Sequence, residues 1–229
     1  QDADSHYNLG NAFNDMGRLE EAETSYKKSI NLNPDFAQAY NKLGMNMRSL
    51  SRLEEAELFC KKAVTLDPGL IIACFNLGSI FKEVGKLDEA EETYTQLIGM
   101  NPDLAEAHNN LGNIYKELGK LGKAEASYKR AIAIKSDYTK AQINLGGLLK
   151  GLRKYEEALK YFDLTNNDYT KSQGLECLYK SENYKEFNER LNSIALEQRI
   201  NIRVAAVSAF ASHQLKKDDP YPFCKNPLD

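Results

Sequence analysis

The sequence has little of the chemistry on which disulfide scaffolds, metal centres and redox sites depend. Its 229 residues include four cysteines, three histidines and no tryptophan. The cysteines lack the CxxC spacing of a zinc or redox site and are sparse for a disulfide framework; they are Cys60, Cys74, Cys177 and Cys224. We therefore expect reduced thiols, a cytoplasmic location, no metal and no cofactor.

Long hydrophobic runs and a strong net charge are also missing. The longest apolar run, Leu70 to Phe75, is far short of the roughly 20 residues that a membrane-spanning helix needs, and no charged and then apolar leader opens the sequence. A formal net charge of −3 argues against a general nucleic-acid binder, whose phosphate contacts require a basic surface. We therefore expect a soluble protein. Because the sequence starts at Gln1 without a methionine and stops at KNPLD, we expect it to be a fragment of something longer.

What the sequence does have is a repeat with a period of 34 residues. Glycines recur at this interval at Gly10, Gly44, Gly78, Gly112 and Gly146. Alanines follow in step at Ala22, Ala56, Ala90, Ala124 and Ala158. An aromatic residue or a cysteine comes four residues after each alanine, at Tyr26, Cys60, Tyr94, Tyr128 and Phe162. A period of this size indicates a stack of similar structural units.

Each unit contains two amphipathic stretches of about a dozen residues, separated by a short turn such as EVGK, where glycine can adopt a positive φ and end the first helix. Each unit is therefore predicted to be a helical hairpin. The glycine inside the first helix costs about 1 kcal/mol relative to alanine. We expect packing to compensate, because a missing side chain lets the first helix approach the second closely at the small alanine.

The pattern AEAHNNLGNIYKELGKLGKAEASYKRAIAI, residues 105–134, closely resembles the tetratricopeptide repeat, with the family's Leu-Gly pair, turn glycine, alanine and aromatic residue in place. Five units within residues 1–172 match the pattern: 3–36, 37–70, 71–104, 105–138 and 139–172. The resemblance implies an all-α, right-handed superhelical solenoid. The sequence departs from the pattern at the family's usual tryptophan, at Ser51 in place of the turn glycine, and after Phe162.

The sequence after residue 172 follows the repeat only loosely. Residues 173–194 still alternate like a helix pair and are predicted to form a degenerate sixth hairpin. Residues 195–215 place Ile200, Val204, Val207 and Leu215 near one helical face, as expected for a helix that caps the open end of a stack. Residues 216–229 contain three of the six prolines and are predicted to be an extended tail or linker.

No arrangement of residues indicates an active site within this chain. His6 and His108 occupy equivalent positions of the repeat, and His213 lies in the predicted capping helix, without a recurring acid or nucleophile beside them. The recurring glycines are explained by the repeat and not by a phosphate-binding loop. Acid pairs such as Glu54-Glu55 lie where second helices begin, where the helix dipole favours them. The fragment is therefore not expected to be an enzyme.

The hypothesis that the protein binds a peptide rests on a row of asparagines. The resemblance implies that the residue two before each repeat glycine points into the inner, concave surface; these residues are Asn8, Lys42, Asn76, Asn110 and Asn144. An amide has both donor and acceptor groups, so a row of amides can pair with the backbone of an extended peptide. Similar asparagine ladders line the superhelix of the O-linked N-acetylglucosamine transferases, where they hold substrate chains. The alternative is that the amides only bond neighbouring repeats or water.

Basic residues border the asparagine row. Four residues past each glycine stand Asn14, Arg48, Lys82, Lys116 and Lys150. At the turns stand Arg18, Arg52, Lys86, Lys120 and Lys154. Acidic residues occupy the second helices at Glu23, Glu57, Glu91 and Glu125, so we expect segregated charge. The basic strip is either a solvated helix face or a docking surface, and in the second case Lys82 and Lys116 contribute to the peptide site.

The sequence thus predicts a protein-interaction module that binds an extended polypeptide in its concave groove. One alternative is the substrate-recruiting N-terminal arm of a larger enzyme, of the glycosyltransferase or iron and 2-oxoglutarate oxygenase type, with its catalytic domain outside this chain. The tail DPYPFCKNPLD faintly resembles the junction that precedes such an oxygenase domain. Another alternative is a self-assembling scaffold, in which the ends of one stack dock on another. No nucleic-acid or membrane partner is expected.

Overall fold

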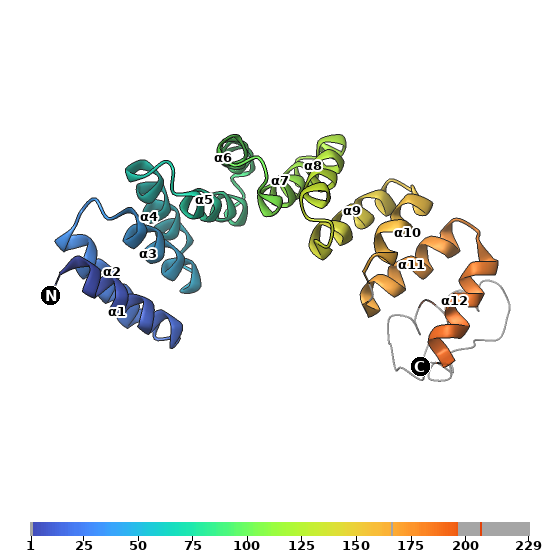
Figure 1. The fold of residues 1–229 in the computed structure, drawn as a ribbon, viewed down its shortest axis with the longest axis horizontal. Coiled ribbons are helices and arrows are strands. Elements are labelled where there is room, and N and C mark those ends of the chain that lie inside the picture. The colour runs from blue at the N-terminus through green and yellow to red at the C-terminus, as the bar shows by residue number, and fades with distance from the viewer. Residues whose placement is uncertain (1, 166, 197–206, 208–229) are drawn as a thin grey trace. The chain divides into compact units, whose positions relative to one another are not determined.

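A computed structural model describes residues 2–165, 167–196 and 207 of the chain. These residues form α-helices connected by short turns, and no strand occurs among them (Figure 1). The helices are α1 (Ala3–Asp15), α2 (Leu19–Leu32), α3 (Ala37–Ser49), α4 (Leu53–Leu66), α5 (Ile71–Glu83), α6 (Leu87–Met100), α7 (Ala105–Glu117), α8 (Leu121–Ile134), α9 (Thr139–Gly151), α10 (Tyr155–Asp163), α11 (Asp168–Lys180) and α12 (Tyr184–Leu196). The protein is an all-α helical solenoid, as the repeat predicts.

The chain divides into two compact units, an N-terminal unit of residues 1–127 and a C-terminal unit of residues 128–229. In the N-terminal unit, α1 packs on α2, α3 on α4 and α5 on α6 within the hairpins, whereas α2 packs on α3, α4 on α5 and α6 on α7 between them. The first helices also contact one another in the order α1, α3, α5 and α7. The hairpins therefore stack in chain order (Figure 1).

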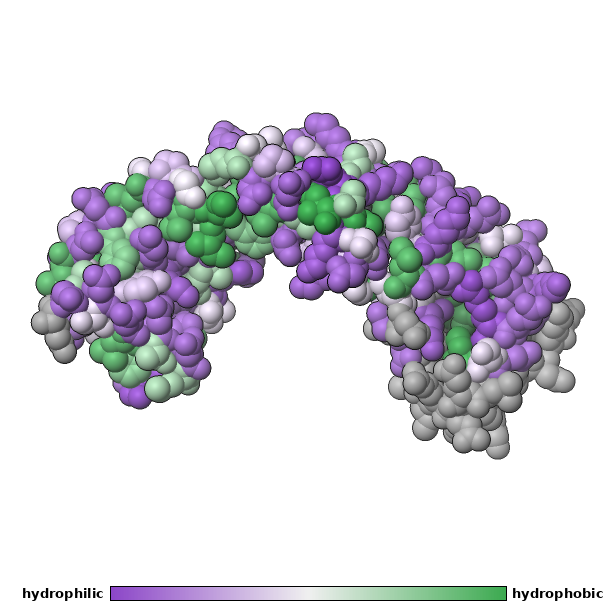
Figure 2. Space-filling view, in the orientation of Figure 1, coloured by the Kyte–Doolittle hydropathy of each residue, from purple (hydrophilic) through white to green (hydrophobic). Residues whose placement is uncertain are grey.

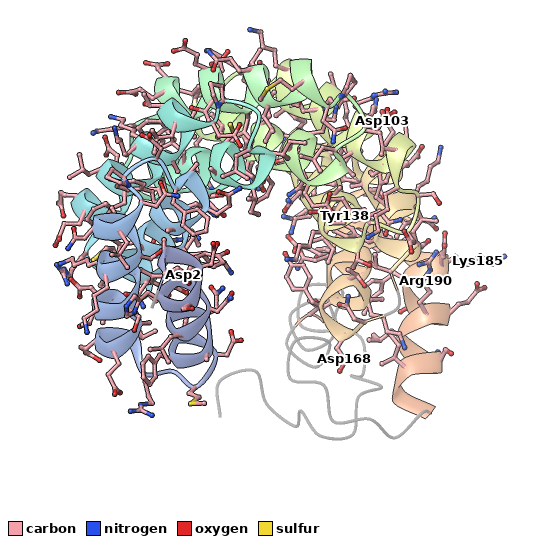
Figure 3. All side chains as sticks on the ribbon, turned by 60° about the vertical axis from the view of Figure 1, so that its left-hand side comes forward. Asp2, Asp103, Tyr138, Asp168, Lys185 and Arg190 are labelled. Carbon is pink, nitrogen blue, oxygen red and sulfur yellow. The ribbon has the colours of Figure 1, made fainter. Side chains whose placement is uncertain are left out.

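The helix boundaries follow the repeat register closely. The first helices of the five predicted units begin at Ala3, Ala37, Ile71, Ala105 and Thr139, which are the first residues of those units. At the start of α1, the Asp2 carboxylate accepts a hydrogen bond from the Ser5 backbone N–H at 2.8 Å and caps the helix (Figure 3).

The turn inside each hairpin requires one residue in the left-handed region. Gly17, Gly85 and Gly119 have φ values of 72°, 81° and 71° and end α1, α5 and α7. Ser51 takes the same role in the second hairpin with a φ of 60°, and Arg153 and Glu182 do so in the last two hairpins, each with a φ of 62°. An L-residue with a side chain is strained by roughly 1–2 kcal/mol in this conformation, so the departure at Ser51 costs stability.

The repeat glycines pack mainly against the residue four positions after the repeat alanine, although at Gly44 the Ala56 carbonyl oxygen also lies 3.1 Å from an added Cβ. A Cβ atom added to Gly10 would lie 2.6 Å from the Tyr26 ring, and one added to Gly78 would lie 2.8 Å from the Tyr94 ring. Gly44 meets the Cys60 sulfur at 2.5 Å in the same way. The aromatic side chain is long enough to reach across the hairpin, whereas alanine is not, so the ring takes the space that glycine leaves.

Buried side chains from the repeat positions form the core of the N-terminal unit. The repeat alanines and the aromatic residues or cysteine after them are fully buried, at Ala22, Tyr26, Ala56, Cys60, Ala90 and Tyr94. They join the repeat leucines, such as Leu43 and Leu77, in one apolar cluster that runs through successive hairpins. Each hairpin thus shares its core with its neighbours, which is the basis of stability in a stack of repeats.

The fifth hairpin is shorter than the others. Its second helix, α10, has 9 residues, whereas α2, α4 and α6 each have 14. Asn167 then caps α11 by accepting a hydrogen bond from the Thr170 backbone N–H at 3.0 Å, and α11 begins at Asp168 (Figure 3). The helix pair α11 and α12 therefore starts five residues before residue 173, inside the range that the repeat register assigns to the fifth unit.

The predicted capping helix, residues 195–215, and the predicted tail, residues 216–229, lie almost entirely outside the described residues. Ala195 and Leu196 form the last residues of α12. Val207 is partly buried and packs against an apolar cluster of α11 and α12, made of Leu175, Leu178, Phe187, Leu191 and Ile194. Among the described helices, none combines the length and the apolar character that crossing a membrane would take.

We predict that Gly78→Ala destabilises the protein by about 1–3 kcal/mol, the usual cost of overpacking, because the new methyl group would collide with the Tyr94 ring. Gly99→Ala in α6 is the matched control, since no atom lies within 4 Å of its added Cβ. That control should gain up to about 1 kcal/mol from helix propensity. Urea unfolding of both variants measures the difference, and a stabilised Gly78→Ala would contradict the close approach.

We predict that Ser51→Gly stabilises the protein by about 1 kcal/mol, because glycine adopts a φ of 60° without steric strain. Gly85→Ala, at a φ of 81°, should destabilise it by a similar amount. Thermal melting of the two variants should therefore shift in opposite directions. A Ser51→Gly variant that melts below the parent would show that Ser51 makes a compensating interaction.

Candidate functional site

The predicted asparagine row lies on the first helices, one residue from each hairpin. In the N-terminal unit, Asn8 and Lys42 are exposed, and Asn76 and Asn110 are half-buried. Asn144 is half-buried on α9 in the C-terminal unit. Asn76 and Asn110 are thus partly exposed, and their hydrogen-bond partners in the protein decide how each amide is oriented.

Asn110 is held by a tyrosine of the preceding hairpin. Its Nδ2 donates a hydrogen bond of 2.8 Å to the Tyr94 hydroxyl. That hydroxyl also shares a hydrogen bond of 2.7 Å with Ser79 Oγ and donates to the Phe75 carbonyl at 3.2 Å. Burial raises the pKa of Tyr94, so its hydroxyl keeps its proton. The network connects α5, α6 and α7 through one buried phenol.

Asn76 is held differently because the preceding hairpin has Cys60 where a tyrosine would stand. A cysteine offers no hydroxyl at that distance, and Asn76 Nδ2 instead donates to Asn41 Oδ1 at 2.9 Å. Asn41 lies on α3 and is buried. The two amides therefore pair directly from first helix to first helix, which is one of the contacts that the alternative reading of the asparagine row predicts.

A pocket with a volume of about 460 Å³ opens beside this network in the N-terminal unit. It is lined by Arg48, Ser79, Lys82, Glu83, Tyr94, Asn110 and Glu117. Asn110 and Lys82 are the two lining residues that the repeat spacing predicted for the peptide site. Ser79, Tyr94, Glu83 and Glu117 were not predicted, although the acids at 83 and 117 each follow a base of the basic strip by 35 residues.

The basic strip is neutralised along this pocket. Arg48 Nε lies 2.6 Å from Glu83 Oε2, and Lys82 Nζ lies 3.1 Å from Glu117 Oε1. Each pair joins the ends of consecutive first helices. Lys116 is exposed and forms no ion pair in the part of the chain that the structure describes. Lys82 is therefore already paired, and Lys116 is the base of the predicted site that is open to an acidic ligand.

The acids of the second helices are not segregated from the bases, contrary to the expectation from sequence. Glu23 accepts from Arg52 at 2.8 Å, Glu57 from Lys86 at 2.7 Å and Glu91 from Lys120 at 2.6 Å. In each pair, the turn of one hairpin reaches the second helix of the hairpin before it. The charges therefore couple neighbouring repeats, and do not form two separate faces.

These ion pairs change the acidity of the carboxyl groups. Burial opposes ionisation of Glu57, but the hydrogen bonds from Lys61 and Lys86 outweigh it, so the pKa of Glu57 is lowered. The hydrogen bond from Lys120 is the main cause that lowers the pKa of Glu91. Both carboxylates are thus held ionised at neutral pH, in the form that joins one hairpin to the next.

His108 and the described cysteines have side chains that are buried or contact the backbone. The His108 ring Nε2 lies 2.9 Å from the Pro102 carbonyl oxygen, and Cys60, Cys74 and Cys177 are buried. Burial raises the pKa of Cys60 to about 12, so it stays a thiol. His213 and Cys224 lie outside the described residues. Within the described ranges, no three metal-ligating side chains come together in a group that could hold a metal ion.

A second pocket, of about 290 Å³, lies in the C-terminal unit where α10 ends early. Asp163 and Arg190 line it, and the Arg190 guanidinium on α12 binds both carboxylate oxygens of Asp163, at 2.5 and 2.9 Å (Figure 3). Arg190 also donates to Glu186. The guanidinium is therefore used to join α12 to α10, and we assign the pocket no ligand.

Family models and solved structures agree with the repeat. A model described as TPR repeat matches residues 10–45 and 78–119, and two models described as tetratricopeptide repeat match residues 37–70 and 105–138. Together they cover residues 10–70 and 78–138, which is more than half of the chain. No curated protein sequence matches the chain significantly.

Three solved structures illustrate the similarity. MamA is 26% identical, with a TM-score of 0.64 over 78% of this chain and 97% of its own. PilF of Pseudomonas aeruginosa is 18% identical, with a TM-score of 0.72 over 94% of this chain and 97% of its own. YrrB is described as a TPR protein with an unusual peptide-binding site. It is 20% identical, with a TM-score of 0.64 over 83% of this chain and 97% of its own. At these identities, PilF and YrrB show a shared fold only.

We predict that Glu57→Gln lowers the melting temperature at pH 7 and that this difference disappears in acid. The pKa of Glu57 is lower in the folded protein than its ordinary value of 4.5, so its contribution is complete above that value and is lost as the pH falls through the folded pKa. Melting temperatures from pH 7 to about pH 3 test this. The control is Glu20→Gln at an exposed position of α2, and a Glu57→Gln difference that stays constant with pH would contradict the coupling.

Proposed function

We propose that this chain, which belongs to the tetratricopeptide repeat family and is thus a protein-interaction module, binds an extended polypeptide along its first helices. The proposed site in the N-terminal unit is the pocket of about 460 Å³ together with Asn76, which precedes the pocket residue Ser79 by one turn of α5. In the C-terminal unit, Asn144 occupies the equivalent repeat position. The observation that carries the proposal is the fixed orientation of Asn110 at the pocket, through its hydrogen bond to the buried Tyr94.

The internal hydrogen bonds orient the asparagines and leave part of each amide for a ligand. A side-chain amide has two N–H donors and a carbonyl oxygen with two lone pairs. Asn76 and Asn110 each use one N–H on a protein partner, at Asn41 and Tyr94. Each of the two amides keeps a second N–H donor and a lone pair on its carbonyl oxygen. A peptide unit of an extended chain, which has one C=O and one N–H, can pair with these two groups. Because the amides are already oriented, binding costs less side-chain entropy.

The paired charges favour recognition of backbone over recognition of an acidic sequence. Arg48 with Glu83 and Lys82 with Glu117 give the pocket lining two positive and two negative groups. An acidic ligand would have to compete with these internal carboxylates. Lys116 is the exception and would add a salt-dependent contribution. The site therefore suits partners of varied sequence, with affinity drawn mainly from hydrogen bonds to the peptide backbone.

Similar structures support this proposal as an analogy. YrrB shares the fold and is described as having a peptide-binding site, so a stack of these hairpins can bind a peptide. In this proposal the chain acts by binding and not by catalysis. The sequence alternative, a substrate-recruiting arm of a larger enzyme, places the same groove beside a catalytic domain, and the full-length reading frame tests it directly.

We predict that Asn76→Ala with Asn110→Ala and Asn144→Ala weakens peptide binding about a hundredfold, if each lost amide bond costs on the order of 1 kcal/mol and the losses add. A peptide selected from a random library on the parent protein serves as the probe, in calorimetric titration. Gln96→Ala, an exposed amide on the second helix α6, is the control and should bind like the parent. Equal affinity of the triple variant, with helicity intact, would reject the groove as the site.

A further inference from the structure

The surroundings of Asn76 differ in kind from those of Asn110. Ile72 lies one turn before Asn76 on α5, whereas Glu106 lies at the same repeat position before Asn110 on α7. Ile72 belongs to the longest apolar run of the sequence, and it is 53% exposed. Figure 2 shows green, hydrophobic atoms over α5. An apolar residue is therefore open to solvent within one turn of a proposed ligand-binding amide.

Met45 is a second apolar residue close to the Asn76 amide. Asn76 donates its hydrogen bond to Asn41, and Met45 lies one turn after Asn41 on α3. Met45 is half-buried and packs against the apolar cluster of the N-terminal unit. Its equivalent one repeat later is Ser79, which lines the pocket at Asn110. Because the two residues share a repeat position, the exposed part of Met45 faces the same side of the first helices as Ser79.

The residue at the position of Met45 changes together with the residue that faces the repeat glycine. In the third hairpin, the Tyr94 hydroxyl shares a hydrogen bond of 2.7 Å with Ser79. In the first hairpin, the Tyr26 hydroxyl donates to Asn11 at 2.9 Å. The second hairpin has neither group, because the buried Cys60 replaces the tyrosine and a methionine replaces its polar partner. The three positions around each amide are therefore Ile72, Met45 and Cys60 at Asn76, and Glu106, Ser79 and Tyr94 at Asn110.

We propose that the bound polypeptide places an apolar side chain beside Asn76, on an apolar subsite formed by Ile72 and Met45, and a polar side chain in the pocket at Asn110. This inference rests on the proposed function and adds a side-chain preference to recognition of the backbone. Packed helices lie about 8–10 Å apart, which corresponds to about three residues of an extended chain at roughly 3.3 Å each. The partner therefore carries an apolar residue and a polar residue three positions apart.

Peptides selected from a random library on the parent protein test this preference. The selected sequences should share an apolar residue three positions from a polar one. Replacing that apolar residue by serine in one peptide should weaken its binding about tenfold in calorimetric titration, because less apolar surface leaves water. Ile72→Ser should weaken binding of the original peptide by a similar factor and should leave the affinity of the serine peptide nearly unchanged. Leu58→Ser, at a residue 62% exposed on the second helix α4, is the matched control and should bind both peptides like the parent.

A second variant gives the second hairpin the hydroxyl pair of the third. Met45→Ser with Cys60→Tyr introduces this pair, and Gly44, which has no side chain, faces residue 60 as the repeat glycine of the third hairpin faces its tyrosine. The double variant should select peptides with polar residues at both positions. Circular dichroism verifies that it is folded, and the exposed Ile72→Ser change provides the test if the double variant does not fold.

The outcomes separate this inference from the proposed function. Selected peptides that bind the triple alanine variant of the asparagine row weakly, but show no apolar preference, would overturn the apolar subsite and leave the groove as the binding site. An equal effect of Ile72→Ser on the original and the serine peptide would do the same. Peptides that bind the triple alanine variant like the parent would overturn the proposed function, and this inference with it.

Discussion

The close contact between a bare glycine and the side chain of the paired helix sets the geometry on which the rest of the protein depends. At Gly10 and Gly78, a tyrosine ring occupies the place where a Cβ atom would stand. Because the ring crosses the hairpin at this point, its hydroxyl emerges on the side of the first helices, where Tyr26 reaches Asn11 at 2.9 Å. Tyr94 reaches Ser79 in its own hairpin and Asn110 in the next. Apolar packing inside a hairpin thus places the polar groups that join it to its neighbour.

Ion pairs add a second connection between hairpins and explain how the charges of the protein are used. The pairs Glu23 with Arg52, Glu57 with Lys86 and Glu91 with Lys120 recur with the same separation of 29 residues. Their glutamate side chains, on the second helices, are only 11–21% exposed, so these pairs are less screened by salt than fully exposed pairs would be. Most of the charged residues that recur with the repeat in the N-terminal unit therefore join neighbouring hairpins. The amides and hydroxyls of the first helices are left as its main recognition groups.

Departures from the repeat are as informative as its regularity. Cys60 fills the place of a tyrosine without its hydroxyl, and Asn76 consequently pairs with Asn41, whereas Asn110 pairs with Tyr94. Asn76 and Asn110, two of the predicted ligand-binding amides, are therefore held by different partners. The sequence identified the positions of both, and of Lys82, from their spacing. Ser79, Tyr94, Glu83 and Glu117 complete the pocket, and they were missed because each is explained locally by packing or by helix composition.

The sequence by itself determined the helical repeat, the first residue of the first helix in each of five hairpins and the turn glycines Gly17, Gly85 and Gly119, because each depends on neighbours within one hairpin. Only the tertiary structure decided which groups meet between hairpins. It placed tyrosine and not alanine against the glycine, paired the second-helix acids with turns 29 residues later, and started α11 at Asp168. These contacts depend on how far each side chain extends across a packed interface. A period of 34 residues contains no information on that distance.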